Sequence, residues 1–438
     1  MLGETPDLGI QIDDSSSIPL IAELPMASGF QLRARLRAAA GDIILSNCEP
    51  PAGYEAYNAD HLDLGHATWL RPSADQDRMT VAKDCLANVT CLDILARALS
   101  QKGGYLHPYL STEEIWQLAA ELTGRSGSGV LVLGPPPALA ALVNNKCSFL
   151  QIARLVAGEQ ATIPFAIACT VADVSGFIEK FKHRMDRIVI RLPDSTAGLG
   201  VKIVDTGALP SGPKLIAELD VILATLGWEK SGDLLLSEWT PSLASVSTQM
   251  WLPPLQAGGP VCEGIYRQRL HPRNGMQYWG ASPAYLPDPT AAELRRLSCL
   301  LCSAFQRAGY VGRCSFDFLL TGERLKSATP IFVECNGRWG GVSAVMSLVD
   351  RVSRPGARPA HSFGPVSGDS LRGAELRDIL AVLAGELYDS RRKSGRGVMA
   401  YHVGGLNAGR MDICTMAEDQ ESAQSLWELC AQKLECTA

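Results

Sequence analysis

Three features that mark particular classes of protein are missing from this sequence of 438 residues. No apolar run approaches the ~20 residues that a helix needs to span a bilayer. Residues 1–17 are acidic and polar, whereas a secretion signal has a basic segment that leads into an apolar one. No long basic run is present, and the net charge of −6 is spread over a large surface. We therefore expect a cytoplasmic protein that binds neither nucleic acid nor a membrane.

The 13 cysteines form no regular framework, and an odd number cannot pair completely. This usage favours a reducing compartment. Cys299 and Cys302 form the only CxxC motif, and no second pair follows at zinc spacing. They fall within residues 290–308, where leucines at helical spacing predict a helix. We therefore expect both thiols to pack in a core rather than to bind a metal.

Length and composition indicate a soluble protein of several domains. Apolar residues make up 46% of the chain and charged residues 20%, which is typical of globular proteins. At ~150 residues per domain, the length suits about three domains. Apolar strands alternate with helical patterns from residue 18 to residue 140, which predicts an α/β domain with a mainly parallel sheet. Residues 1–17 are expected to form a mobile tail.

Two short apolar strands, Ser315–Leu320 and Pro330–Asn336, carry the most informative polar residues. An antiparallel pairing centred on their connection sets Asp317 across from Glu334, with Asn336 on the same face. Like charges in such positions repel unless a cation lies between them, and Mg²⁺ prefers carboxylate and amide oxygens. The alternative is that both acids are solvated strand residues.

In that alternative, the two acids pair with one of three nearby arginines, Arg313, Arg324 or Arg338. The residues that follow favour a ligand site. Asn336 leads into Gly337-Arg338-Trp339-Gly340-Gly341, where glycine backbone can approach a ligand closely and Arg338 offers five donors to a phosphate or carboxylate.

This order of residues, Asp, a strand connection, then Glu-x-Asn-x-Arg, resembles the metal and phosphate end of the ATP-grasp superfamily. The resemblance implies an ATP-grasp fold with bound ATP and Mg²⁺ or Mn²⁺, where Asp317, Glu334 and Asn336 are the metal ligands. It also implies that a domain like that of residues 18–140, called a pre-ATP-grasp domain, precedes the nucleotide-binding lobes.

Residues for the upstream half of an ATP site occur in the expected order. Val143-Asn144-Asn145-Lys146 resembles the family's Asn-Asp-Lys segment, whose lysine reaches the phosphates. Arg191 stands where the family usually has a second lysine. The loop that follows is rich in small residues, and its backbone N–H groups are candidates to cover the phosphates; its candidate ligands are Ser195, Thr196, Gly198 and Gly200.

The strand that ends at Glu238 and Trp239 resembles the hinge between the two ATP-grasp lobes, where adenine binds. Glu238 is the candidate for the adenine side, and a solvated carboxylate at a strand end is the alternative. Thr240–Met250 contains no acid, so the ribose contacts stay unassigned.

The resemblance divides the rest of the chain as well. It implies an N-lobe over residues 141–236 and a C-lobe with the metal site over residues 237–350. Residues 351–373 are rich in proline, glycine, serine and alanine and predict a linker. Residues 374–438 predict a small α+β module, which would complete the active site or form a homodimer contact.

Within the superfamily, the chain most resembles the pheganomycin-type peptide ligases. The similar segments are Tyr278–Pro287, Glu334–Arg351, Gly397–Gly405 and the segment that ends at Lys146. This resemblance implies a ligase that converts a small-molecule carboxylate into an acyl phosphate and joins it to the amine of an amino acid or peptide. The alternatives are an ATP-grasp carboxylase, a carboxylate–thiol ligase and a protein that binds ATP without turnover.

In such a ligase, Arg191 and Arg338 would stabilise the phosphoryl group in transfer. Arg338 and the backbone near Gly340 and Gly341 would stabilise the oxyanion that follows. The absence of a GxSxG motif agrees, because this chemistry needs no serine nucleophile.

A basic segment and three aromatic residues are the candidates for substrate recognition. Arg267 and Arg269 lie in a basic segment with His271 and Arg273, which suits a substrate carboxylate or a solvated loop equally. Three aromatic residues are candidates for an acceptor pocket or for core packing: Tyr278, Trp279 and Trp339.

Overall fold

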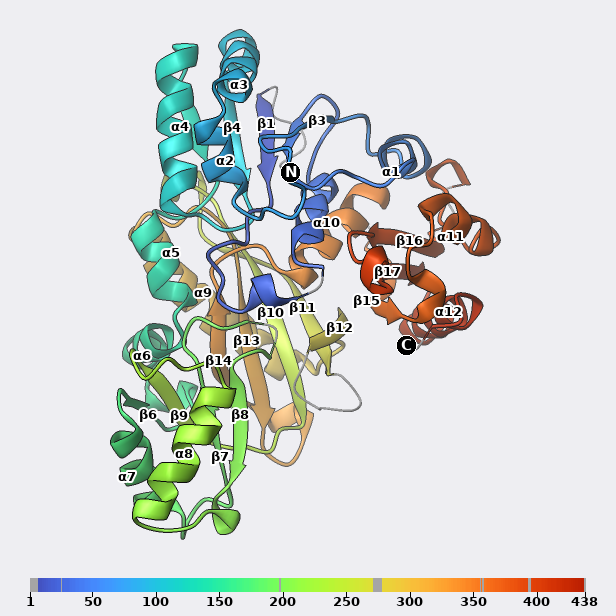
Figure 1. Ribbon diagram of the computed structural model, residues 1–438. Coiled ribbons are helices and arrows are strands. Elements are labelled where there is room, and N and C mark those ends of the chain that lie inside the picture. The colour runs from blue at the N-terminus through green and yellow to red at the C-terminus, as the bar shows by residue number, and fades with distance from the viewer. Residues whose placement is uncertain are drawn as a thin grey trace.

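The strands in the described part of the chain form three sheets, of five, eight and four strands. In the computed structural model the five-stranded sheet lies at one end and the four-stranded sheet at the other, with most of the eight-stranded sheet between them (Figure 1). The structure describes residues 7–24, 26–196, 198–270, 278–354, 356, 358–392 and 395–436. No helix in these ranges is long and apolar enough to cross a bilayer.

The five-stranded sheet is parallel throughout and has the order β3-β2-β1-β4-β5. Its strands are β1 (Leu8–Ile12), β2 (Ile43–Leu45), β3 (Thr68–Leu70), β4 (Gly104–Pro108) and β5 (Val130–Val132). Its main helices are α2 (Val81–Ala87), α3 (Val89–Lys102) and α4 (Glu113–Ser126). The chain runs outward from β1 to β3 and returns beside β1 as β4, so the topological switch point lies between the carboxyl ends of β1 and β4.

The prediction of a mobile tail over residues 1–17 is wrong for the part that the structure describes. Leu8–Ile12 is the central strand β1, and all five of its residues are buried. The apolar side chains of Leu8, Ile10 and Ile12 alternate along it and fill the core under α3 and α4. A strand of this length is easily missed among acidic and polar neighbours.

The four-stranded sheet is antiparallel and has the order β6-β9-β7-β8. Its strands are β6 (Phe165–Ala168), β7 (Arg187–Arg191), β8 (Val201–Asp205) and β9 (Leu234–Glu238), and its helices are α7 (Val171–Phe181) and α8 (Pro213–Thr225). Strands β7 and β8 form a hairpin whose loop is the predicted phosphate-covering segment.

The eight-stranded sheet has the order β14-β13-β10-β11-β12-β15-β17-β16. The first five strands are β10 (Ala244–Leu252), β11 (Val261–Leu270), β12 (Tyr278–Pro283), β13 (Gly312–Thr321) and β14 (Thr329–Asn336). Phe316 and Phe332 pack against Phe149 of α6 (Lys146–Ala157), and Phe305 of α9 (Asp288–Arg307) joins them. Helices α5 (Pro137–Asn144) and α10 (Gly341–Val352) lie next to the site described below.

The predicted linker over residues 351–373 is wrong in its middle, because Ala360–Ser367 forms β15. This strand pairs with β17 (Arg410–Ala417), which pairs with β16 (Gly397–His402). The C-terminal segment thus extends the large sheet, through one bridge between Ala281 and Phe363, and does not build a separate one. Glycine, serine and proline in β15 led to the prediction of a linker, although seven of its eight residues are buried.

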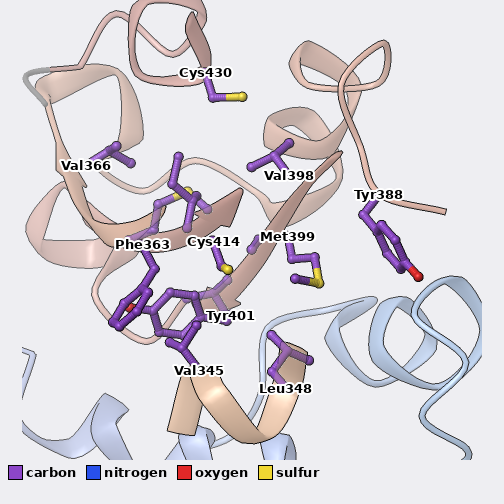
Figure 2. Packing of buried hydrophobic residues seen from close by; sticks show 14 of the residues in the cluster. Val345, Leu348, Phe363, Val366, Tyr388, Val398, Met399, Tyr401, Cys414 and Cys430 are labelled. Carbon is purple, nitrogen blue, oxygen red and sulfur yellow. The ribbon is translucent and has the colours of Figure 1, made fainter. Parts of the chain in front are cut away.

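The C-terminal strands and α10 share one hydrophobic core with helices α11 (Leu376–Val382) and α12 (Gln420–Lys433). Figure 2 shows Phe363, Tyr401 and Cys414 of the sheet close to Val345 of α10. Cys430 of α12 packs into the same core from the far side of these strands. Helix α10 therefore packs in the same core as the C-terminal strands.

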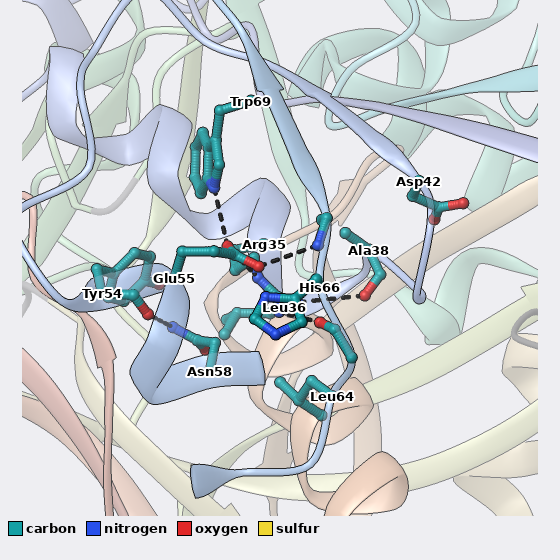
Figure 3. Close-up of polar contacts among 12 residues, drawn as sticks. Arg35, Leu36, Ala38, Asp42, Tyr54, Glu55, Asn58, Leu64, His66 and Trp69 are labelled. Carbon is teal, nitrogen blue, oxygen red and sulfur yellow. Dashed lines mark hydrogen bonds and ion pairs between the residues drawn. The ribbon is translucent and has the colours of Figure 1, made fainter. Parts of the chain in front are cut away.

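The far end of α10 is anchored in the first domain. The Arg351 guanidinium donates to the carbonyls of Leu36, Ala38 and Leu64, at 2.8, 2.7 and 3.2 Å. Beside it, buried Arg35 pairs with Glu55 at 2.7 Å, and Glu55 also accepts from the Trp69 indole at 2.8 Å (Figure 3). These contacts fix the short helix η2 (Ser28–Leu36) between the first domain and α10.

Candidate functional site

The two acidic residues of the predicted metal site face each other across a strand pair. Asp317 of β13 is paired directly with Glu334 of β14, as the sequence predicted, and a β-bulge follows Asp317. Asn336 lies two residues further along, and its amide donates to Asp317 Oδ2 at 3.4 Å. Two carboxylates and an amide therefore converge on one face of the sheet.

The pKa values of the two carboxyl groups are shifted in opposite directions. Burial and the nearby Glu334 carboxylate raise the pKa of Asp317 well above its usual range. Burial also acts on Glu334, but the Lys146 ammonium and the Arg338 guanidinium outweigh it and hold the pKa of Glu334 below its usual value. The two pKa values are displaced in opposite directions, as expected for closely spaced carboxyl groups that titrate as a pair.

Lys146 connects three parts of the site. It is the first residue of α6, whose N-cap Asn145 accepts from the backbone N–H of Ser148 at 3.1 Å. Lys146 Nζ lies 3.1 Å from Glu334 Oε2 and donates to the carbonyl of Ser195 in the β7–β8 loop. A buried cation at a helix N-terminus is unfavourable by itself, so the carboxylate is its necessary partner.

Arg338 also contacts three segments. It donates to Asn336 Oδ1 at 2.6 Å, to Asn144 Oδ1 at 3.1 Å and to Thr196 Oγ1 at 2.6 Å. Its Nε is buried and has no hydrogen-bond partner among the described residues. The alternative that Arg313 neutralises the acids is not realised, because Arg313 pairs with Glu263.

Asn144 belongs to the site, although no role was predicted for it from the sequence. Its side-chain oxygen accepts from the backbone N–H of Gly337 at 3.0 Å as well as from Arg338. A side chain at Gly337 would collide with Val143 and with the Asn144 amide. Asn144 therefore fixes the turn that carries Arg338, and only glycine fits at the first position of that turn.

Arg191 is 6% exposed and lies at the end of β7. It donates to Ser237 Oγ at 3.2 Å, and Ser237 is a second residue that the sequence did not single out. Burial lowers the pKa of Arg191, and the Glu334 carboxylate opposes that effect, so the guanidinium lies within electrostatic reach of the acid pair. Its Nε has no hydrogen-bond partner in the described part of the chain.

The β7–β8 loop folds back on itself over this group. Leu192 N donates to the Gly200 carbonyl at 2.8 Å, and Ser195 Oγ donates to the Leu192 carbonyl at 2.9 Å. Gly198 and Gly200 have positive φ values of 78° and 65°, which residues other than glycine rarely adopt. The predicted loop residues thus lie beside Lys146 and Arg338.

The backbone at the start of α10 is only partly available to a ligand. The Gly340 N–H, predicted as an oxyanion donor, already donates to Ser343 Oγ at 2.8 Å. Gly341 is the first residue of α10 and has no carbonyl four residues before it within the helix. Of the two predicted glycines, Gly341 is therefore the one with an N–H to offer.

The other predicted residues lie apart from this group. Glu238 is the last residue of β9, just beyond Ser237, and Trp239 follows the strand; Trp239 N donates to the Arg187 carbonyl at 3.0 Å. Arg267 is exposed. Arg269 donates to the Phe363 carbonyl at 2.7 Å and to Gln424, and its guanidinium lies 4.4 Å from the Trp427 ring centroid.

Arg269 thus joins β11 to α12, and its two terminal nitrogens already have acceptors in the protein. His271 and Arg273, predicted as part of the same cluster, lie outside the described residues. Cys302 packs in the core with its sulfur 3.7 Å from that of Cys314, and Cys299 is partly buried, in line with the prediction that the CxxC motif is a packing feature.

The charges of the central group suit a cation and a polyphosphate together. In the described ranges no three His, Cys, Asp or Glu side chains form a metal site by themselves. Two carboxylates and an amide fit Mg²⁺, which usually completes its coordination with water and substrate phosphates. Lys146, Arg191 and Arg338 surround the pair, so positive charge exceeds negative charge until an anion binds.

Comparison with known proteins agrees with this architecture. Residues 32–124 match the model of the family described as the pre-ATP-grasp domain. A biotin carboxylase from Campylobacter jejuni, solved with beta-gamma-ATP, is 13% identical with a TM-score of 0.59, over 100% of this chain and 93% of that chain. No curated protein matches the sequence.

Two further solved structures have the same fold. The biotin carboxylase domain of Hydrogenobacter thermophilus 2-oxoglutarate carboxylase, a dimer with MgADP, ADP and bicarbonate, is 12% identical with a TM-score of 0.54, over 94% of this chain and 88% of that chain. N5-carboxyaminoimidazole ribonucleotide synthetase from Thermus thermophilus is 13% identical with a TM-score of 0.53, over 98% of this chain and 97% of that chain. The chain therefore has an ATP-grasp fold preceded by a pre-ATP-grasp domain.

Proposed function

We propose that this protein is an ATP-dependent ligase that activates a carboxylate as an acyl phosphate and joins it to an amine, releasing ADP and phosphate. The amine is that of an amino acid or peptide. The observation that carries the proposal is the pairing of Asp317 with Glu334 beside Lys146. Two carboxylates that suit Mg²⁺ thus lie next to a lysine that suits a phosphate.

Asp317, Glu334 and Asn336 would hold Mg²⁺ or Mn²⁺, which when bound supplies countercharge to the ATP phosphates. Lys146 and Arg191 neutralise phosphate oxygens from the N-lobe side. Their positions are fixed before ATP arrives, since Lys146 is held by Glu334 and Arg191 by Ser237. Such preorganised charge is the main source of catalysis in phosphoryl transfer.

The chemistry begins when a substrate carboxylate attacks the γ-phosphorus of ATP and ADP leaves. The amine then attacks the acyl carbon, and phosphate leaves as the amide forms. Arg338, which the Thr196 hydroxyl holds, and the Gly341 N–H at the start of α10 would stabilise the oxyanion of that second step. The Ser195–Gly200 loop excludes water, which would hydrolyse the acyl phosphate.

A carboxylase is the strongest competing proposal, because the similar structures are named as carboxylases and a carboxyaminoimidazole ribonucleotide synthetase. A carboxylase would use the same residues to bind the metal ion and the ATP phosphates. The two proposals differ in the acid that is activated, which is bicarbonate in one case and an organic carboxylate in the other.

The test is to incubate the protein with ATP, Mg²⁺, amino acids and short peptides whose carboxylates carry ¹⁸O, in bicarbonate-free buffer. An amide product with one ¹⁸O transferred to phosphate supports an acyl phosphate. Glu334→Gln should abolish both signals, whereas Glu293→Gln, an exposed acid on α9, should change neither.

Product that appears only when bicarbonate is added would replace the ligase with a carboxylase. A thioester product, formed when thiols are included, would identify a carboxylate–thiol ligase. Stoichiometric ATP binding without release of phosphate under any of these conditions would identify a binding protein.

A further inference from the structure

A second group of polar residues lies between the first domain and the C-terminal strands. Arg33 comes from η2, Arg410 and Asp412 from β17, and His402 from the end of β16. The Asp412 carboxylate lies 3.3 Å from His402 Nδ1 and 3.6 Å from Arg410 Nε. The His402 ring also contacts the Gly29 carbonyl of η2, so segments 373 positions apart in the sequence converge.

Tight packing brings Arg33 to this group. His402 Nε2 lies 3.2 Å from the Gly29 carbonyl, and its ring stacks on Phe30 with centroids 5.2 Å apart. The backbones of Gly29 and Gly404 are so close that a side chain at either would collide with the other. One turn later on η2, the Arg33 guanidinium lies over the rings of Phe30 and Tyr109, at 4.4 and 4.9 Å.

The charges of this group leave one cation unbalanced. Asp13 lies 2.5 Å from Arg37 and 3.7 Å from Arg33, so two guanidiniums share this one carboxylate. Asp412 is the second carboxylate, and His402, Arg410 and Arg33 together outweigh the effect of burial and lower its pKa. Three guanidiniums, those of Arg33, Arg37 and Arg410, therefore share two carboxylates. Asp412 Oδ1 and Arg410 Nε are buried 3.6 Å from each other and have no other partner among the described residues, so Arg410 has its terminal nitrogens to offer a ligand. An excess guanidinium with unused donors suits a carboxylate.

Tyr278 connects this group to the ATP-grasp site. Its ring is 3.4 Å from where a side chain at Gly341 would begin. Burial raises the pKa of Tyr278, Arg269 opposes the shift, and Asp412 and Asp317 add to it, so the phenol lies within electrostatic reach of both acids. Its buried oxygen has no hydrogen-bond partner in the described part of the chain.

The sheet sets the separation of the two groups. Strands β10, β11, β12 and β15 lie between β13, which carries Asp317, and β17, which carries Asp412. At ~4.8 Å per strand the flat distance is about 24 Å, and sheet twist shortens it. An extended peptide advances ~3.3 Å per residue, so roughly four to seven residues span the gap.

We propose that Arg33 and Arg410 bind the terminal carboxylate of a peptide acceptor whose amino end reacts near Arg338, with Asp13 orienting Arg33 and Asp412 orienting Arg410. This inference rests on the proposed function and adds to it the length and the free C-terminus of the acceptor. The site lies at the switch point between β1 and β4, where open parallel sheets bind ligands.

The test is a competition between two forms of the acceptor peptide in the same reaction. The protein, ATP and Mg²⁺ are given an amino acid as the acyl donor and an equal mixture of random-sequence hexapeptides with free and amidated C-termini. Mass spectrometry measures the ratio of ligated acid to ligated amide. We expect the acid to be favoured at least tenfold, and random dipeptides to show no such preference.

In Arg33→Gln and Arg410→Gln the ratio should fall towards one, while the KM for ATP stays within twofold. Arg33→Lys keeps the positive charge but loses the paired donors of the guanidinium, so it should give an intermediate ratio. Arg377→Gln, an exposed arginine of α11, is the control and should leave the ratio unchanged.

Equal use of both hexapeptide forms by the wild type would overturn the inference and leave the ligase proposal standing. So would a preference for the acid that Arg33→Gln does not reduce. If neither form is ligated although ATP is consumed with another acceptor, both the inference and the peptide part of the proposed function are wrong.

Discussion

The indole N–H of Trp339 donates a hydrogen bond to Nε2 of His107 over 3.0 Å, and the two residues belong to different domains. The Trp339 backbone N–H also donates to the Tyr109 carbonyl at 3.0 Å. The indole lies between the guanidiniums of Arg37 and Arg313, each 4.8 Å from its centroid. The carboxyl end of β4 thus fixes the residue next to Arg338.

We predict that Trp339→Phe, which removes the indole N–H and keeps an aromatic ring, lowers kcat about tenfold or more. The reason is that Arg338 loses its fixed position, and small displacements of a catalytic group are costly. Steady-state kinetics with saturating ATP and acceptor would measure the effect.

His107→Gln provides the matched control, because the glutamine oxygen can still accept the indole N–H. Its kcat should stay within about threefold of the wild type, whereas His107→Leu should resemble Trp339→Phe. If all three variants had equal kcat, the contact between the domains would have no role in placing Arg338.

Two buried histidines should make folding stability depend on pH. Burial lowers the pKa of His107 well below 6.5, with Arg37 and Arg313 adding to the effect. Burial likewise lowers the pKa of His361 to about 4. Unfolded histidines take up protons below about pH 6.5 while these two remain neutral, so the unfolded chain binds more protons and stability falls as pH decreases.

The predicted slope is up to ~1.4 kcal/mol per pH unit for each histidine below pH 6.5. Chemical denaturation between pH 7.5 and 5.5 would measure it. His107→Gln keeps the hydrogen bond and does not titrate, so its stability should fall less steeply than that of the wild type. Parallel curves would show that His107 is protonated in the folded protein.

The strand pair of the site was predictable from the sequence, because it depends on local rules. Apolar alternation and a short polar connection fix both the register and the shared face of Asp317 and Glu334, and the structure has that register. The roles predicted for Lys146, Arg191, the loop after it and the hinge came instead from the resemblance to a family.

The errors arose where tertiary packing decides the structure. Leu8–Ile12 is too short to be distinctive and becomes a strand because β2 and β4 flank it. Ala360–Ser367 has a loop-like composition and becomes a strand because β17 pairs along its whole length. Asn144 and His107 act on residues almost 200 or more positions away, and no local pattern predicts such contacts.

Removing one charge from the acid pair should separate catalysis from folding. We predict that Glu334→Gln keeps the hydrogen bond to Lys146 and the fold, but lowers turnover by at least a hundredfold, because the metal ion loses a charged ligand. Titration with Mg²⁺ should show a higher requirement. An unchanged rate and an unchanged Mg²⁺ requirement would contradict the metal assignment, with Glu293→Gln as the control for surface acids.

The β7–β8 loop can be tested through Gly200. An alanine there would adopt an unfavourable φ of 65° and meet the Ser195 side chain at 2.8 Å. We predict that Gly200→Ala raises the KM for ATP at least fivefold, because the loop no longer closes correctly. Gly232→Ala is the control, since Gly232 has a similar φ of 83° but open space around it; it should lose about 1 kcal/mol of stability without a change in KM.

The bond between Arg338 and Thr196 joins the loop to the C-lobe and gives the sharpest pair of variants. Thr196→Val keeps the shape and removes the acceptor, so kcat/KM should fall about tenfold, as expected for a hydrogen bond to a charged group. Thr196→Ser restores the hydroxyl and should restore the rate. If the valine variant instead bound ATP more tightly and kept its kcat, the bond would hold the loop in a resting position that ATP must displace.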